Sequence, residues 1–220
     1  MKERPILFSG AMVRAILDGR KTQTRRAVKP QPPAGTREVG IYHYPSDRDC
    51  FYPFDGGSII GGWAQHCPYG QPGDRLWVRE TWQHENFPLG PYEPDCTVFY
   101  RADHLDDQLG PDLERSADGI RRRWNPSIHM PRAACRLVLE ITGVRVERLQ
   151  DISYEDAIAE GMFNPGTIES TYPLTGETGE QLGRRLSHPQ RSFAILWEEL
   201  NGAGAWAANP WVWVVEFRRA

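Results

Sequence analysis

The chain has 220 residues, of which 40% are hydrophobic and 25% charged, and its formal net charge at pH 7 is −3. These values are ordinary for a globular protein, and the length allows one large domain with a substantial core. The slightly acidic balance argues against a surface that coats nucleic acid, although the first 30 residues hold eight Lys and Arg against two acidic residues.

No apolar run approaches the ~20 residues that a membrane-spanning helix needs, and no secretory signal pattern opens the chain. The four cysteines are far apart and form no C-x-x-C pair: Cys50, Cys67, Cys96 and Cys135. This usage is typical of reduced thiols, so we expect a cytoplasmic protein without a membrane partner. A monomer is compatible with the sequence, which does not fix the oligomeric state.

The N-terminal segment predicts a strand, a short helix and a second strand. Residues 5–8 form a short apolar run, and Ser9 directly after it is a good helix N-cap. Gly19 stands where a helix ends in a left-handed residue. Beyond it, strand alternation puts Thr24 and Arg26 on one face.

The stretch from Gly19 to Arg26 gathers an amine, two threonine hydroxyls and three guanidinium groups within eight residues. Strict alternation would put Lys21 and Thr24 on opposite faces. The two side chains converge only if Lys21 belongs to the turn and its stem bends back. Composition alone favours a solvated basic turn.

Residues 30–74 contain seven Pro and eight Gly, one third of the stretch, interleaved with aromatic residues. The Pro and Gly content is typical of disorder, but aromatic side chains at this density indicate an ordered insertion that packs on the rest of the fold. Cys50, His66 and Cys67 offer zinc-binding atoms, yet their spacing matches no standard ligand pattern. We therefore predict no metal site.

Residues 75–82 alternate well enough to predict one strand. On it, Glu80 and Trp82 share a face, which makes Glu80 a candidate pocket carboxylate. Trp77 or Trp82 could stack a pyrimidine, although either is more often a core residue when taken singly.

Two later segments carry further candidates. Arg123 and Trp124, in a basic cluster, could hold a phosphate and stack a base, although such a cluster is more often an exposed turn. After a strand pair near residues 135–147, Ser153 begins a helix that Gly161 ends. Glu160 therefore lies in the last turn, where the helix dipole disfavours an anion, and such a local conflict is sometimes functional.

Gly19, Lys21 and Arg26, with Thr24 between them, resemble the G-x-K-x-x-(E/T)-x-R signature of the ASCH domain, a small β-barrel related to PUA RNA-binding domains. The run from Ile16 to Arg26 is similar to the start of bacterial ASCH amidohydrolases, which remove the acetyl group from N4-acetylcytidine. The resemblance implies an α+β fold, a single PUA-like barrel over residues 1–220 with flanking helices. Two long loop insertions, about 30–70 and 163–188, would interrupt it, as in ASCH proteins of phage and prophage genomes.

The resemblance also implies catalytic roles. Thr24 would attack an amide carbonyl, Lys21 would activate it or stabilise the oxyanion, and Glu160 would orient the amine or relay the proton. Arg26 would steady the oxyanion or the ligand. Whether Lys21 or Glu160 is the base stays open, because burial and neighbouring cations lower a lysine pKa whereas a carboxylate raises it.

No cofactor is required by this scheme, and the partner would be a small nucleoside or RNA. Two alternatives remain: a non-catalytic module that binds RNA or a modified base, and a ribonuclease.

Overall fold

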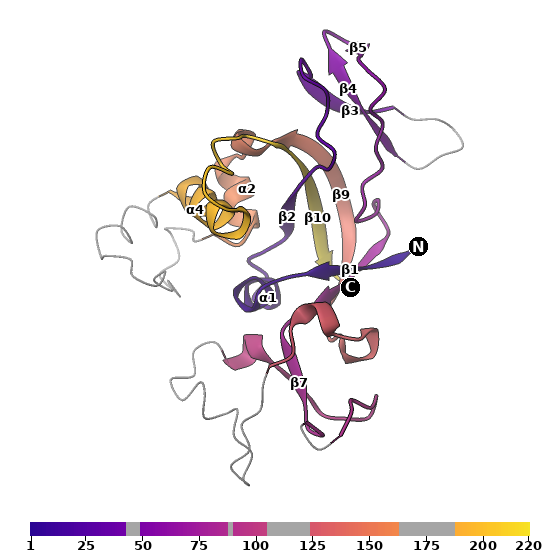
Figure 1. The fold of residues 1–220 in the computed structure, drawn as a ribbon, viewed down its shortest axis with the longest axis vertical. Helices are drawn as coiled ribbons and strands as arrows, with labels where there is room; N and C mark the ends of the chain where they lie inside the picture. The colour runs from indigo at the N-terminus through magenta and orange to yellow at the C-terminus, as the bar shows by residue number, and fades with distance from the viewer. Residues whose placement is uncertain (43–48, 88–89, 105–123, 163–187) are drawn as a thin grey trace.

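The computed structural model describes residues 1–42, 49–87, 90–104, 124–162 and 188–220. These residues form an α+β fold around a five-stranded sheet with the strand order β1–β6–β9–β10–β2 (Figure 1). β1 and β6 run parallel, and every other neighbouring pair in this sheet is antiparallel. The strands are β1 (Glu3–Leu7), β2 (Gln23–Ala27), β6 (Arg75–Arg79), β9 (Val138–Arg148) and β10 (Trp211–Arg219).

Strand β10, which lies between β9 and β2, is buried on both faces because it separates two hydrophobic clusters. Trp211, Trp213, Val215 and Phe217 alternate into the larger cluster, because successive side chains of a strand point to opposite faces. Val212 and Val214 point to the opposite cluster, which contains residues of α2 (Tyr154–Ala159) and α4 (Pro189–Asn201). Trp211 and Trp213 of this strand are therefore core residues.

The N-terminal elements agree with the sequence. Helix α1 (Gly10–Leu17) begins where the Ser9 hydroxyl accepts the N–H of Met12, at 3.4 Å. Val13 and Ile16 turn into the larger cluster. Gly19 has φ +75°, the left-handed conformation that a side chain disfavours, and the chain there leaves the helix toward β2.

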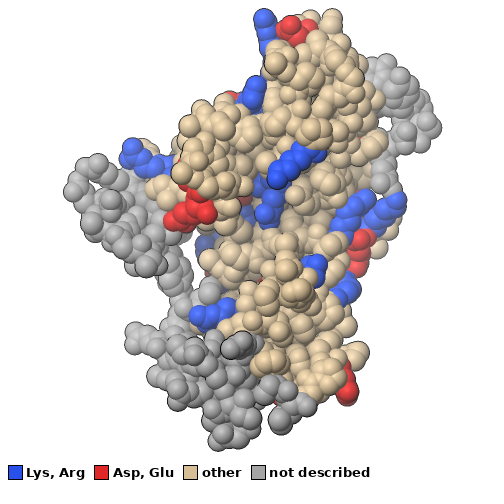
Figure 2. All heavy atoms as spheres, viewed as in Figure 1, with Lys and Arg blue, Asp and Glu red and all other residues tan. Residues whose placement is uncertain are grey.

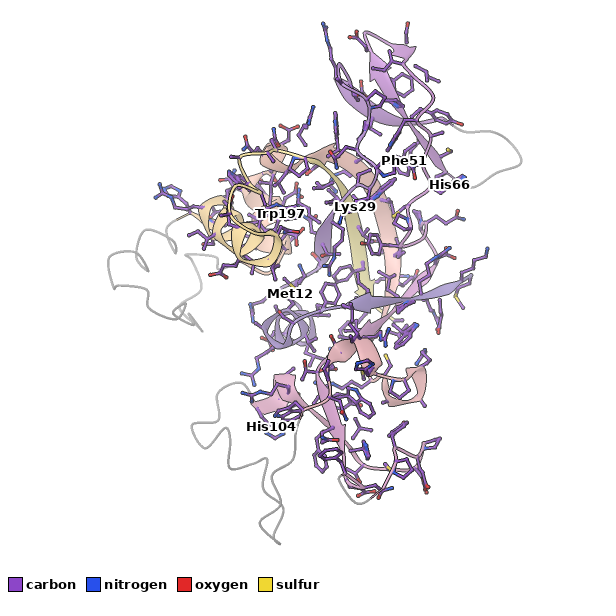
Figure 3. All side chains as sticks on the ribbon, in the orientation of Figure 1. Met12, Lys29, Phe51, His66, His104 and Trp197 are labelled. Atoms are coloured by element: carbon purple, nitrogen blue, oxygen red, sulfur yellow. The ribbon has the colours of Figure 1, made fainter. Side chains whose placement is uncertain are left out.

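The first insertion is not only loop, contrary to the sequence expectation. It forms a three-stranded antiparallel sheet of β3 (Glu38–Tyr42), β4 (Cys50–Asp55) and β5 (Ser58–Ile59). Phe51 anchors it, because its ring meets that of Trp213 edge-on at 4.9 Å (Figure 3). The insertion lies at one end of the long axis (Figure 1). Residues 163–187 of the second predicted insertion lie outside the described residues.

A small unit lies at the opposite end (Figure 1). The predicted single strand over 75–82 is wrong: β6 stops at Arg79, and β7 (Trp82–His84) pairs instead with β8 (Val98–Tyr100). The chain leaves β6 at Glu80, whose carboxylate is buried against Arg136. Short 3₁₀ turns complete the described fold: η1 (Arg101–His104), η3 (Ser127–His129), η4 (Arg132–Ala134) and η5 (Leu149–Asp151).

The five-stranded sheet is open among the described residues, so no closed barrel is present there. Its edge strands are nevertheless connected, because an Arg26 guanidinium nitrogen on β2 donates to the carbonyl of Leu7 on β1 at 2.7 Å. None of the helices in the described part of the chain is long and apolar enough to cross a bilayer.

Candidate active site

The site lies where the turn after α1 meets the end of α2. An isolated antiparallel bridge joins Lys21 to Glu160, and the N–H of Thr22 donates to the carbonyl of Ala159 at 2.8 Å. The Lys21 amine donates to the Glu160 backbone carbonyl at 2.9 Å and to its Oε2 at 2.7 Å. An amine and a carboxylate 139 residues apart in sequence thus form one contact.

Local sequence explains how Glu160 reaches this position. The Ser153 hydroxyl accepts the N–H of Asp156 at 3.0 Å, which starts α2, and Glu160 is the C-cap residue of this helix. Gly161 then adopts φ +91°. A Cβ on Gly161 would lie 3.1 Å from the Lys21 Cβ and 3.2 Å from the Ala15 Cβ, so only glycine allows this close approach.

Both members of the pair are buried: Lys21 is 2% exposed and Glu160 4%. Burial lowers the pKa of Lys21, and it outweighs the opposing effect of Glu160, while Arg26 and Arg25 lower the pKa further. A lysine of this kind releases its proton more readily than a solvated one. The lowered pKa is a shift in the direction that a lysine acting as general base requires.

Thr24 is 3% exposed and pairs with Val215 in the β2–β10 ladder. Within the described part of the chain, its hydroxyl makes no hydrogen bond, either to Lys21 or to Glu160. Arg26 lies on the same strand, and both its guanidinium and the Lys21 amine lie over the Phe8 ring, 5.5 Å and 5.7 Å from the ring centre. The structure thus joins Lys21 with Glu160, and the side-chain hydrogen bonds that it shows for these two residues do not include Thr24.

The other predicted carboxylate has a different role. Glu80 is 1% exposed, and both of its oxygens accept from Arg136, at 2.9 Å and 3.0 Å. Burial raises the pKa of Glu80 although Arg136 opposes this. Arg136 also lies over the Tyr100 ring. These contacts hold the unit of β7 and β8 against the main sheet, and none of them includes Lys21 or Glu160.

The candidate stacking residues differ from one another. Trp77 is half-buried on β6, and the guanidinium groups of Arg79 and Arg132 lie 5.3 Å and 6.0 Å from its ring. Trp82 is a core residue instead, 4% exposed, with its ring edge-on to Tyr92. A ring that is buried in this way has no free face on which a pyrimidine could stack. Trp82 therefore belongs to the core and does not serve as a stacking residue in this structure.

The Trp124 ring is partly buried, 6.1 Å from the ring of His104 and 5.8 Å from the Arg101 guanidinium. His104 is labelled in Figure 3 within the unit opposite the insertion. Arg123 lies outside the described residues. Its predicted phosphate contact therefore stays a prediction.

Two functional residues escaped the sequence analysis. Arg25 donates to Glu160 Oε1 at 3.3 Å and Gly161 makes room for Lys21. The strand pattern puts Arg25 on the face away from Thr24, so it predicts no role for Arg25 beside Thr24. The available signal was the charge asymmetry: residues 140–180 hold nine acidic groups against two arginines, and these are the partners of a basic strand.

The described residues contain no group of three His, Cys, Asp or Glu that could hold a metal ion, so Cys50, His66 and Cys67 form no such cluster there. His66 and Cys67 instead line a small, partly open pocket of about 20 Å³ beside the first insertion, with Arg4 and Asp74 (Figure 3 labels His66). None of the residues that line it is a predicted catalytic residue.

Comparisons with protein-family models, with curated proteins and with solved structures found no match. The resemblance to ASCH domains therefore rests on the motif between Gly19 and Arg26 and on the residues that correspond to it.

Proposed function

We propose that this protein is an amidohydrolase that removes an acyl group from an acylated nucleoside or base of the N4-acetylcytidine type. The observation that carries the proposal is the buried contact between Lys21 and Glu160, with a lowered Lys21 pKa. Buried ionisable pairs with perturbed pKa values concentrate at functional sites. Both members of the pair are also among the three residues to which the ASCH resemblance assigns catalysis.

In the proposed reaction Lys21 takes the hydroxyl proton of Thr24 while the Thr24 oxygen attacks the amide carbonyl. Arg26 stabilises the negative charge on the resulting tetrahedral oxygen. The C–N bond breaks when the proton passes from Lys21 to the leaving amine, with Glu160 orienting both groups. Water then attacks the acyl–threonine ester, and the carboxylic acid leaves with threonine restored.

The proposal includes the fold. We assign the chain to the PUA-like class, with the described α+β core as an ASCH domain. The motif that opens β2 supports this assignment, and so does the Arg26 hydrogen bond that connects the two edge strands of the sheet. An experimental structure that closes the sheet between β1 and β2 would agree with it.

Lys21, Thr24 and Glu160 are all at most 4% exposed. A substrate can reach them only when part of the surrounding structure moves. The proposal therefore requires an opening motion before turnover, as in many enzymes that exclude water from their chemistry.

The test is to incubate the protein with N4-acetylcytidine and to follow the change in ultraviolet absorbance on conversion to cytidine. Thr24→Ala, Lys21→Met and Glu160→Gln should each reduce kcat by at least about 10²-fold, the usual contribution of a group that acts in proton transfer or attack. Matched controls are Thr22→Ala, Lys29→Met and Glu155→Gln, because these three side chains are exposed. The controls should retain activity.

Full activity in Thr24→Ala would remove the nucleophile from the scheme. No activity of the unmodified protein on N4-acetylcytidine or on other N-acylated cytidines would remove the amidohydrolase proposal as a whole.

A second candidate function is binding of RNA without catalysis. One observation favours it: the half-buried Trp77 ring on β6 has the guanidinium groups of Arg79 and Arg132 nearby, at 5.3 Å and 6.0 Å, which sets an aromatic ring beside cations that could hold a phosphate. Figure 2 shows Lys and Arg side chains gathered across the middle of one face, with acidic side chains toward its edges.

If RNA binding is the function, affinity should fall with salt concentration and survive Glu160→Gln. Trp77→Ala should weaken it by roughly 5- to 100-fold, the range of one base–aromatic stack. Tyr154→Ala is the control, because Tyr154 is an exposed aromatic residue on α2. Affinity that ignores Trp77→Ala would exclude this surface.

A further inference from the structure

The Glu160 carboxylate is divided between two cations. Its Oε2 accepts from the Lys21 amine at 2.7 Å, and its Oε1 accepts from the Arg25 guanidinium at 3.3 Å. Arg25 has a fully buried side chain and carries its charge permanently. Lys21 is the only one of the two that can lose a proton at moderate pH.

Arg25 is itself fixed from three sides. Its second terminal nitrogen donates to Glu147 on β9 and, at 2.9 Å, to Asp156 on α2. Its guanidinium also lies against the Phe193 ring of α4, 5.8 Å from the ring centre. A planar guanidinium has the geometry for several fixed carboxylate contacts, which a lysine cannot reproduce.

A second arginine, Arg145, binds two of the carboxylates that fix Arg25. Arg145 donates to Glu147 at 2.9 Å and to Asp156 at 3.0 Å, and it also contacts Glu216 on β10. The two arginines and their carboxylates form a network across β2, β9, β10 and α2. Arg25 therefore cannot move away from Glu160 without breaking contacts on three other elements.

This arrangement has an electrostatic consequence for Lys21. If Lys21 were the only cation beside Glu160, the carboxylate would stabilise the protonated amine strongly and raise the Lys21 pKa. Arg25 takes up one oxygen and adds a positive charge nearby. The charged groups that face Lys21 are Glu160 from α2 and Arg25 and Arg26 from β2, so Arg25 acts on the amine both directly and through Glu160.

We propose that Arg25 is a positioning residue of this site, which shares the Glu160 carboxylate with Lys21 and so keeps the amine ready to lose its proton. The inference rests on the proposed function, because it assigns Lys21 the role of base. In this scheme Thr24 and Arg26 lie on the face of β2 that is turned toward the substrate. Arg25 lies on the opposite face and favours loss of the Lys21 proton.

The decisive experiment measures the Lys21 pKa by nuclear magnetic resonance of ¹⁵N-lysine-labelled protein, in the unmodified chain, Arg25→Met, Arg25→Lys and Arg20→Met. We expect Arg25→Met to raise the Lys21 pKa by about one unit or more, the usual effect of a neighbouring charge. Arg25→Lys should give a smaller rise. Arg20→Met removes an exposed cation next to Lys21 that pairs with Asp18, and it should change nothing.

Activity gives a second readout. A higher Lys21 pKa should move the rising limb of the kcat/KM pH profile upward by the same amount, with about a tenfold loss at neutral pH for each unit. Loss of folding alone would lower kcat/KM at every pH and leave the limb in place. Arg25→Lys should recover part of the shift.

An unchanged or lower Lys21 pKa in folded Arg25→Met overturns the inference. If that variant does not fold by circular dichroism, Arg25→Lys decides by the same measurement. Activity with an unmoved pKa would remove the role of Arg25 and leave the proposed function standing. A raised pKa in a protein without amidohydrolase activity would remove the function and show the electrostatic coupling alone.

Discussion

A Cβ atom added to Gly161 would lie 3.1 Å from the Cβ of Lys21, which is tighter than nine in ten Cβ contacts in proteins. The approach is this close because the turn after α1 and the end of α2 pair through their backbones at this point. The geometry of the candidate site therefore depends on a residue that contributes no side chain to it.

Gly161→Ala should destabilise the protein by about 2–4 kcal/mol, because it adds strain at a positive φ and overpacks the Lys21 stem. Urea denaturation measures the change. The matched control is Gly202→Ala, where φ is +95° and no atom lies within 4 Å of the added Cβ. The control carries the backbone strain without the clash, so equal losses in the two variants would contradict the packing argument.

A double-mutant cycle tests the Lys21–Glu160 pair. Lys21→Met should cost about 3–5 kcal/mol of unfolding free energy, because Glu160 keeps a buried charge with one partner fewer. The double variant Lys21→Met/Glu160→Gln should be less destabilised than the sum of the single variants, with a coupling of about 1–3 kcal/mol. Additive losses would mean that the two side chains do not interact in solution.

Asp156 makes the stability depend on acid pH. Burial by itself would raise the pKa of Asp156, but Arg25 and Arg145 outweigh it and hold the pKa below its ordinary value of 3.8. The unfolded chain then takes up this proton at higher pH than the folded chain does. The stabilisation is complete above the ordinary pKa and is lost as the pH falls through the lowered one.

The unfolding free energy should consequently decline from about pH 5 to pH 3 in the unmodified protein, and less steeply in Asp156→Asn. Unfolding with guanidinium chloride at several pH values measures how steeply the unfolding free energy changes with pH. Glu155→Gln, the exposed neighbour on α2, serves as the control with the same change of charge. A slope in Asp156→Asn equal to that of the unmodified chain would contradict the prediction.

The attachment of the first insertion depends on Phe51. Phe51→Ala should cost about 3–5 kcal/mol, the usual loss for a buried aromatic residue, because its ring packs against Trp213. Ile59→Ala on the neighbouring strand should change stability by less than about 0.5 kcal/mol, because Ile59 is 47% exposed. Thermal unfolding of the unmodified protein and the two variants measures both changes in stability.

Local signals predicted the N-terminal part of the fold well. The Ser9 cap and the left-handed Gly19 both depend on neighbouring residues, so a single sequence contains them. The Glu160 position was found for the same reason, because its conflict with the helix dipole is visible within one helix.

What the sequence could not give depends on contacts between distant segments. The strand over 75–82 ends early because Glu80 meets Arg136, which lies 56 residues further on. Arg25 gained its role from three acidic residues that follow it by more than 120 positions. Alternation indicates which face of the strand such a residue occupies, but not which side chain from a distant segment it contacts there.

Arg26 has a consequence beyond its place in the motif. The strands at the two rims of the central sheet, β1 and β2, are joined by its hydrogen bond to the Leu7 carbonyl. Unpaired rims are where sheets of separate molecules add to one another and aggregate. With the side chain of one rim bound to the backbone of the other, a strand from a second copy that approached β1 would meet an occupied acceptor at Leu7.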